Sequence, residues 1–365
     1  MSETLLSVRG LTVHYPVRTD GSFRRRTEVV RAVDGIDLDV PRGTTFGLVG
    51  ETGSGKSTLG RAILQLTPPT AGTVDLAGVR LTSLRGEALR HARRRMQMVF
   101  QNPLASLDPR QRIGSIIEEP FVAHGVYPTR AERTARVAEL IALVGLAPDV
   151  VSRRPQELSG GQRQRVGIAR AIALHPDLVV ADEPVSALDV SIQAQIINLL
   201  QDLQSRLGLT YLLIAHDLAV VHHISHVIAV MYLGRIVELA DSDEIVTGPR
   251  HPYTVALLSA VPESDPSREG ARRRVMLPGT PPSPVHPPAG CAFHTRCWLR
   301  ERLGRPPACE TQSPPLMELT AGHLVSCHFA DRILGSLPPR IQETTAAADT
   351  ATVGATVTEP DRASA

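Results

Sequence analysis

The stretch GLVGETGSGKSTLG, residues 47–60, decides how the rest of this 365-residue chain is interpreted. An apolar segment, TTFGLVG at 44–50, runs into a glycine-rich turn, and STLGRAILQL at 57–66 follows with the spacing of an amphipathic helix. The turn contains Lys56, the only lysine of the chain, whereas the other 38 of its 39 basic residues are arginines. We therefore expect a strand, a tight turn and a helix here, with an ammonium group that an arginine cannot replace.

GETGSGKS at 50–57 has the spacing G-x-x-x-x-G-K-S, which suits a loop wrapped around a polyphosphate. Its glycines allow successive backbone N–H groups to turn toward one concavity, and the following helix adds its positive N-terminal dipole. Lys56 supplies a compact point charge, which a planar guanidinium does not, and Ser57 supplies a hydroxyl ligand for Mg²⁺. The alternative is a glycine-rich turn that binds nothing, and the strand before it and the helix after it argue against this alternative.

LVVADEP at 178–184 is an apolar strand that ends in two carboxylates. Asp182 fits a ligand of Mg²⁺ or of its water. Glu183 points to the other face and fits the general base that polarises an attacking water, a role that contributes about 10²- to 10⁴-fold. The alternative is an acidic strand end that caps a neighbouring helix, and the phosphate loop in the same chain favours the catalytic interpretation.

Two polar residues follow other apolar strands. Gln101 comes after MQMVF at 96–100, where its amide is placed to reach the metal or the water. His216 follows YLLIA at 211–215, where its imidazole is placed to sense the terminal phosphate. A single glutamine or histidine is also common in purely structural roles, so these two candidates depend on the other motifs.

LSGGQRQRVGIARAIAL at 158–174 begins with the pattern S-x-x-Q of a capping box, formed by Ser159 and Gln162. Gly160 and Gly161 leave the N–H groups of the first helical turn uncovered, and such a terminus attracts an anion. Because one loop already holds the phosphates, a second anion site is expected to face the nucleotide of another subunit and to close a dimer over ATP.

Strands that alternate with helices over residues 1–250 predict a parallel sheet covered on both faces. VSIQAQIINLLQDLQSRLG at 190–208 is a long amphipathic helix, and residues 102–168 form a mostly helical block inserted into the α/β core. A proline-rich segment and a cysteine cluster predict a small second domain over 251–335. Residues 336–365 have almost no large apolar side chains and are expected to be a disordered tail.

The bulk composition excludes several classes. A net charge of +2 gives no electrostatic case for a nucleic-acid binder. The first residues lack the basic and apolar regions of a signal peptide, and the apolar run VIAVMYL at 227–233 is far shorter than the roughly 18 residues that span a bilayer. A soluble protein is expected, whose membrane role, if any, comes through a partner.

The motifs together resemble those of the ATP-binding cassette (ABC) ATPases, and they occur in the order of that family: the phosphate loop, LSGGQ at 158–162, ADEP at 181–184, SALD at 186–189 and AHD at 215–217. The resemblance implies an α/β P-loop fold, with a RecA-like parallel sheet, an antiparallel β part and an inserted helical subdomain. Thr52 stands where serine is common in the family, a change that is expected to be harmless.

The resemblance also implies roles for individual residues. Tyr15 would stack on adenine, Gln101 would couple the nucleotide state to a membrane partner, and His216 would be the γ-phosphate switch. Ser159, Gly160, Gly161 and Gln162 would contact ATP across the dimer, and Asp189 would link the two sites. The implied phosphate-loop contacts are Gly50, Glu51, Thr52, Gly53, Ser54, Gly55, Lys56, Ser57 and Thr58; Mg²⁺ would be held by Ser57, Gln101 and Asp182.

A narrower resemblance covers nearly the whole ordered chain. RRRMQMVFQNPLASLDPR at 93–110, HPYTVALLSAVP at 251–262, LPGTPPSP at 277–284 and GCAFHTRC at 290–297 are similar to the oligopeptide/dipeptide importer ATPases, and more to the second ATPase of the pair than to the first. In that family a paralogous ATPase forms a heterodimer with the chain beneath two permease subunits. An extracytoplasmic binding protein supplies the cargo, so the resemblance implies a place on the cytoplasmic face of the membrane.

All four cysteines, Cys291, Cys297, Cys309 and Cys327, lie within one segment of a chain that has no others. Four thiolates suit tetrahedral Zn²⁺ or an iron–sulfur cluster, although no tight C-x-x-C pair is present. Buried or paired thiols without a metal are the third possibility. Members of the resembling importer group can carry a [4Fe–4S] cluster in a domain of this pattern.

Other functions remain open at this point. Within the importer interpretation, nickel, glutathione or another small solute could replace peptide, because the ATPase does not touch the cargo. A soluble cassette ATPase acting on DNA or ribosomes would usually need a coiled-coil insertion, tandem cassettes or a basic arm, and the sequence has none. A regulatory nucleotide-binding module without turnover is disfavoured by the intact Glu183 and His216.

Overall fold

The computed structural model of the chain describes residues 3–19, 26–186, 188–261 and 274–333. They belong to two compact units. The first unit contains residues 1–237 together with the short segment 281–287, and the second contains residues 238–280 and 288–365.

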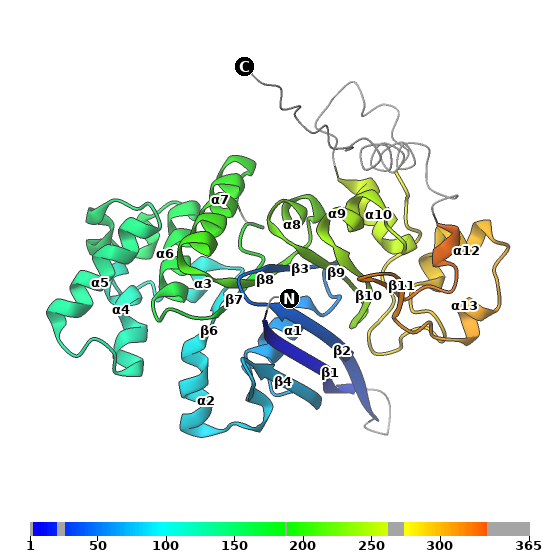
Figure 1. Cartoon of the computed structure of the whole chain (residues 1–365), viewed down its shortest axis with the longest axis horizontal. Coiled ribbons are helices and arrows are strands. Elements are labelled where there is room, and N and C mark those ends of the chain that lie inside the picture. Colours follow the sequence, from blue (N-terminus) through cyan, green and yellow to red (C-terminus); the bar gives the residue numbers. More distant parts are fainter. Residues whose placement is uncertain (1–2, 20–25, 187, 262–273, 334–365) are drawn as a thin grey trace, which may run out of the picture. The chain divides into compact units, whose positions relative to one another are not determined.

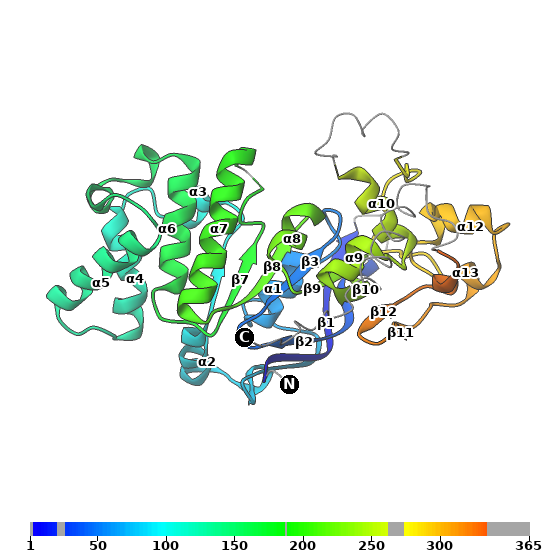
Figure 2. The same ribbon diagram turned by 45° about the horizontal axis from the view of Figure 1, so that its top comes forward.

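The centre of the first unit is a parallel sheet in which the strands follow the order β9, β3, β8, β7 and β6 (Figures 1 and 2). Strands β3, β7 and β8 are buried along their whole length, which is why their sequences are mostly apolar. Because parallel strands end at the same edge, the residues that follow β6, β7 and β8 can meet there. The strands are β3 (Thr45–Val49), β6 (Met96–Val99), β7 (Leu178–Asp182), β8 (Thr210–Ala215) and β9 (Val227–Tyr232).

An antiparallel sheet lies beside it in the same unit, with the strand order β2, β1, β4 and β5, so that β2 is an edge strand (Figure 1). It confirms the antiparallel part that the family resemblance implied. The elements are β1 (Thr4–Thr19), β2 (Arg26–Pro41), β4 (Ala71–Leu76) and β5 (Val79–Arg80), followed by η1 (Leu81–Ser83), α2 (Gly86–Ala92) and η2 (Arg93–Arg95).

Helix α1 (Lys56–Ile63) begins directly after the glycine-rich turn. It packs against β7 and β8 of the parallel sheet and against β1 and β2 of the antiparallel one. The helix is shorter than the sequence predicts: it ends at Ile63, Gln65 takes a left-handed conformation with φ 55°, and Leu66 is 47% exposed. The apolar pattern therefore extended beyond the segment that the two sheets cover.

The block expected to be helical between 102 and 168 is mostly helical. Helix α5 begins with a capping box in which Thr129 and Glu132 exchange hydrogen bonds. The elements are α3 (Pro103–Ser106), α4 (Ile113–His124), α5 (Arg130–Leu143), η3 (Pro148–Ser152), η4 (Pro155–Glu157) and α6 (Gly160–Ile172).

Two more helices complete the first unit. Helix α7 (Val190–Leu207) matches the predicted amphipathic helix: Asp189 caps its N-terminus and Gly208, with φ 64°, ends it. Helix α8 (Leu218–Ile224) packs against β3 and β8. Within the described ranges, each helix is too short or too polar to span a membrane.

The second unit is small and is built around two features. Val255, Leu299 and Ile333 form an apolar core, and strand β10 pairs antiparallel with β12 through Glu238 and Leu239. Its elements are β10 (Arg235–Asp241), α9 (Ser242–Thr247), α10 (Pro252–Ala260), η5 (His294–Arg296), α12 (Trp298–Arg302), α13 (Ala308–Thr311), β11 (Met317–Thr320), β12 (His323–Val325) and η6 (Ala330–Arg332).

The border between the units differs from the one expected near residue 250. It lies between Val237 and Glu238, inside β10, because the second half of this strand pairs with β12. The segment 281–287 also returns to the first unit. The tail predicted over 336–365 lies outside the described residues.

Candidate functional site

The phosphate loop has the backbone that its glycines were expected to provide. Gly53 and Gly55 have φ values of 84° and 105°, a region that side chains with a Cβ rarely adopt. A Cβ on Gly50 would lie 2.2 Å from the carbonyl oxygen of Met231, and one on Gly55 would lie 2.0 Å from that of Ala32. Glycine is therefore required here both for the turn and for the close approach of neighbouring strands.

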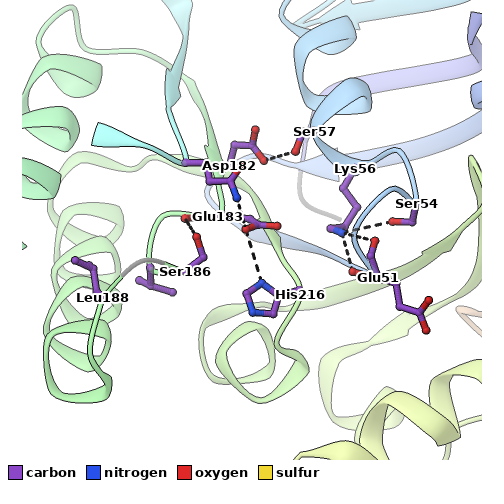
Figure 3. A network of polar contacts seen from close by, with 12 residues as sticks. Glu51, Ser54, Lys56, Ser57, Asp182, Glu183, Ser186, Leu188 and His216 are labelled. Carbon is purple, nitrogen blue, oxygen red and sulfur yellow. Dashed lines mark hydrogen bonds and ion pairs between the residues drawn. The ribbon is translucent and has the colours of Figure 1, made fainter. Parts of the chain in front are cut away.

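Lys56 lies inside this loop and is only 4% exposed (Figure 3). Its Nζ donates hydrogen bonds to the carbonyl oxygens of Gly50 (2.7 Å) and Glu51 (3.0 Å) and to Oγ of Ser54 (3.4 Å). Burial lowers the pKa of the ammonium, although the carboxylates of Glu183, Asp182 and Glu51 oppose this shift. The positive charge is thus held in the concavity by neutral acceptors.

Ser57 and Asp182 lie together as the Mg²⁺ hypothesis requires. Oγ of Ser57 donates to Oδ1 of Asp182 over 2.7 Å, which joins the first turn of α1 to the end of β7 (Figure 3). Burial raises the pKa of the Asp182 carboxyl. A hydroxyl beside a carboxylate is an oxygen donor set of the kind that Mg²⁺ prefers, so these two residues fit the ion.

Glu183 lies where the ends of three neighbouring strands meet. Nε2 of Gln101 donates to Oε2 of Glu183 over 2.7 Å. Nδ1 of His216 lies 3.7 Å from the same oxygen (Figure 3). The backbone of Glu183 has φ 46°, which is strained for a residue with a Cβ, and its N–H donates to the carbonyl of Ile214 (2.8 Å). The structure thus brings together three of the residues that the sequence singled out as catalytic.

The second anion-binding motif is formed at the start of α6. Oγ of Ser159 accepts from the N–H of Gln162 (3.3 Å), and the side chain of Gln162 accepts from the N–H of Ser159 (3.0 Å), so the predicted capping box is confirmed. Gly161 has an additional role, because a Cβ there would lie 2.7 Å from Ile192 of α7. Close packing of α6 on α7 is a reason for glycine that the sequence alone did not reveal.

Two further candidates have clear positions. Tyr15 lies on β1 opposite Val30 of β2, and the residue is 40% exposed. Asp189 caps α7: its Oδ1 accepts from the N–H of Ile192 (3.0 Å) and from Oγ of Ser191 (2.7 Å), and these hydrogen bonds lower its pKa. Thr52 is exposed, in keeping with a harmless substitution.

The four cysteines are all free thiols in the second unit. Burial, together with the charge of neighbouring thiols, raises the pKa of Cys297 to about 12 and also raises those of Cys291 and Cys327. The N–H of Cys291 donates to the carbonyl of Cys309 (2.9 Å). Within the described residues no group of three or more His, Cys, Asp or Glu side chains is arranged to hold a metal ion.

Sequence analysis missed a polar cluster beside the phosphate loop. Asp34 on β2 accepts from Arg235 (2.8 Å) and from His14 (3.1 Å), and its N–H donates to the carbonyl of Gly234 (2.9 Å). The N–H of Gly234 in turn donates to the carbonyl of Ser54 (2.9 Å). No sequence motif indicates these residues, because each is isolated in the sequence and they come together only through strand pairing.

The first unit has the fold and the site of a P-loop ATPase. Residues 33–186 match the family model described as ABC transporter, and residues 237–302 match the one described as oligopeptide/dipeptide transporter, C-terminal region. The chain is 50% identical over 328 residues to the oligopeptide transport ATP-binding protein AppF of Bacillus subtilis (strain 168), an alignment that covers 90% of this chain and 98% of AppF. The chain belongs to the ABC transporter family and is one of its ATPases.

Solved structures support the same assignment. The dimeric structure of a post-hydrolysis state of the ATP-binding cassette MJ0796, bound to ADP and Pi, matches with a TM-score of 0.58 and 28% identity. The match covers 65% of this chain and 99% of the MJ0796 chain. The cbiO1 cassette from Clostridium perfringens, part of the ABC transporter complex cbiONQ, matches with a TM-score of 0.58 and 25% identity over 68% of this chain and 92% of its own.

Proposed function

We propose that this chain is the ATP-hydrolysing subunit of an importer that carries dipeptides or oligopeptides across the cytoplasmic membrane. The observation that carries the hydrolytic part is the position of Glu183, whose carboxylate lies between Gln101 and His216 and directly after Asp182. The cargo class rests on the match of residues 237–302 and on the relatives that are named for oligopeptide transport.

The residues of the first unit have distinct parts in the proposed reaction. The backbone N–H groups of the loop and Lys56 hold the β- and γ-phosphates, and the phosphate oxygens replace the carbonyls to which Lys56 now donates. Ser57, Asp182 and Gln101 are the proposed Mg²⁺ ligands, and the ion neutralises charge on the phosphates. Glu183 takes a proton from the attacking water, His216 stabilises the γ-phosphate, and Tyr15 stacks on the adenine.

Hydrolysis is proposed to need a second ATPase. Ser159 and Gln162 form a capping box in which each side chain accepts from the backbone N–H of the other residue, and Ser159 is exposed, which supports a role at the nucleotide of a partner. Asp189, at the N-terminus of α7, is the proposed link between the two sites. By resemblance the partner is a paralogous ATPase, so that the pair is a heterodimer, with an extracytoplasmic binding protein delivering the cargo.

The proposed docking surface for a permease is a groove with a volume of about 310 Å³ between β6 and α4. It is lined by apolar side chains such as Met98, Phe100 and Pro120, with Arg170 and Glu119 among the charged ones. Phe100 immediately precedes Gln101, so a permease segment seated here would act on the residue that contacts Glu183. This arrangement supports attachment at the cytoplasmic face of the membrane.

The four cysteines are a separable part of the proposal. The shared burial of the thiols and their influence on one another's pKa support a common environment. In the observed arrangement they do not fit a metal ion, so no step above depends on a [4Fe–4S] cluster or on zinc. A brown protein with about four irons per chain after anaerobic purification would support the cluster hypothesis, whereas a colourless, metal-free and active protein would reject it.

The decisive test replaces Glu183 with Gln in the chromosome and follows the uptake of labelled dipeptides, longer peptides and Ni²⁺ side by side. We expect selective loss of peptide uptake, while the purified variant still binds ATP. A matched control is Glu87→Gln on α2, whose side chain is 89% exposed, and it should leave every uptake unchanged. Loss of Ni²⁺ uptake alone would replace peptide by nickel as the cargo. Unchanged uptake of all three would mean that the cargo assignment is wrong or that another ATPase replaces this one.

A further inference from the structure

The segment Pro281–Pro287, called here the strap, belongs to the first unit although the residues before and after it belong to the second. Its sequence is PPSPVHP. Because proline has no N–H group, the strap contributes mainly carbonyl acceptors. Ser283 gives it a defined turn: its Oγ accepts from the N–H of Val285 (3.2 Å), and its carbonyl accepts from the N–H of His286 (3.2 Å).

The strap lies against the open edge of β2. The N–H of Arg31 donates to the carbonyl of Pro284 over 3.2 Å, and Nε2 of His286 lies 3.4 Å from Oε1 of Glu28. An edge strand exposes unpaired N–H groups, and a chain segment that offers carbonyls is a natural cover for them. The strap therefore fixes the stretch of β2 from Glu28 to Arg31.

This same stretch of β2 runs into the wall of the phosphate loop. The carbonyl oxygen of Ala32, the next residue, is so close to Gly55 that a Cβ there would lie 2.0 Å from it. Further along, Asp34 is tied to Gly234, which is tied in turn to Ser54 of the loop. With contacts this close, a small displacement of β2 moves the loop or collides with it.

The middle of the stretch pairs with the strand that carries the proposed adenine contact. Val30 is the register partner of Tyr15, and Val29 is the partner of Pro16. One short length of β2 thus contacts the strap at its outer edge, the aromatic residue of β1 at its inner edge and the phosphate loop at its end.

We propose that the strap is a positioning element of the ATP site, in which Pro284 and His286 hold β2 where Tyr15 and the phosphate loop can bind the nucleotide together. The chain continues from both ends of the strap into the second unit. The strap therefore connects the nucleotide site to the C-terminal unit along the chain, through a short segment that is hydrogen-bonded to β2. Binding linkage then requires that ATP stabilise the strap contact as much as the strap contact stabilises bound ATP.

The first test measures the dissociation constant of ATP and the steady-state kinetics of the full chain in Glu28→Gln and His286→Ala. His286 is largely exposed and Glu28 is partly buried, so we expect ATP binding to weaken by up to about fivefold, with KM raised and kcat unchanged. Exchanging the partners, Glu28→His with His286→Glu, should restore affinity. Asp39→Asn, which lies on β2 like Glu28 and breaks an exposed pair with Arg9 of β1, is the matched control and should leave KM unchanged.

The second test uses hydrogen exchange, which reports the contact itself. In the wild-type chain ATP should slow exchange at the amides of Arg31 and His286, and Pro284→Gly, which loosens the strap, should remove most of this protection. The amide of Arg9 on β1 serves as the internal control.

The inference rests on the proposed ATP site, and the outcomes separate the two. A wild-type chain that does not bind ATP would reject the site itself. A chain that binds ATP, with unchanged KM in both side-chain variants and no nucleotide-dependent protection at Arg31, would overturn the strap proposal alone.

Discussion

Lys56 and Asp182 in the first unit are 4% and 1% exposed, and in the second unit Glu238 and His323 are equally buried. Burial alone dominates the pKa of the first two, lowering that of Lys56 and raising that of Asp182. Glu238, by contrast, accepts from His323 (2.8 Å) and from the N–H groups of Arg250 and His251. In the ATP site, the charged groups of Lys56 and Asp182 are placed to bind a ligand. In the second unit, the carboxylate of Glu238 already accepts hydrogen bonds from three groups of the protein.

The largest expected effect is a loss of stability when the hydrogen-bonded network around Glu238 is broken. Glu238→Ala removes the acceptor of two N–H groups and of His323 in a buried place, so the free energy of unfolding should fall by about 3–5 kcal/mol. Chemical denaturation of the full chain measures it. Glu244→Ala, whose half-exposed carboxylate lies 3.6 Å from the same histidine, is the control and should change stability little. An unchanged free energy of unfolding in Glu238→Ala would contradict the proposed difference between the two units.

Lys56→Ala tests the ATP site, where we expect a loss of activity rather than a loss of stability. Removing a donor aimed at the phosphates should lower kcat by at least about 100-fold, while stability should be nearly unchanged, because burial already disfavours the charged amine. Lys56→Arg should fail almost as badly, since a guanidinium does not fit a loop in which Nζ lies 2.7 Å from the carbonyl of Gly50. Full activity of the arginine variant would remove our explanation for the single lysine.

A pH prediction concerns His251, which is buried in the second unit and caps α10 by accepting from the N–H of Tyr253 (3.1 Å). Burial lowers its pKa from 6.5 to about 3. Below pH 6.5 the unfolded chain binds a proton that the folded chain refuses, so stability falls with falling pH, by up to about 1.4 kcal/mol per pH unit until about pH 3.

His251→Asn should flatten this part of the pH dependence, because asparagine keeps an acceptor for the N–H of Tyr253 but does not titrate. Urea unfolding at a series of pH values compares the two chains. Parallel curves for the wild type and the variant would contradict the assignment to His251.

The smallest effect compares two capping boxes of the first unit. Ser159→Ala and Thr129→Ala each remove an N-cap oxygen, so each should cost about 1 kcal/mol of stability. Only Ser159→Ala should also lower ATP turnover in the assembled transporter, because Thr129 has no proposed contact with nucleotide. Equal loss of turnover in both variants would assign Ser159 a purely structural role.

The catalytic cluster could be predicted because its members follow the ends of apolar strands. Asp182, Gln101 and His216 each come directly after such a run, and parallel strands bring their ends together whatever the rest of the chain does. The capping box of Ser159 and Gln162 is local, so the sequence pattern was sufficient. The resemblance to the ABC family added the order of the motifs and the antiparallel sheet.

The remainder depends on contacts between distant segments. Nothing local indicates that Pro284 reaches β2 or that Asp34 lies beside the phosphate loop, since both depend on strand register and on a return of the chain. Helix α1 ends early because coverage by the two sheets ends, although the apolar pattern continues to Leu66. The spacing of the cysteines suggested a metal, but spacing does not determine where four thiols point in a loop-rich unit.

The single lysine gives the chain one ε-amine, and that amine lies inside the phosphate loop. Its lowered pKa leaves more of it as the reactive free base at a given pH than an exposed lysine would have, but only 4% of the residue is open to solvent. An amine-directed reagent therefore has only this group and the α-amine to modify. The rate of labelling at Lys56 would report directly how often the loop opens and how fully nucleotide occupies it, without any engineered probe.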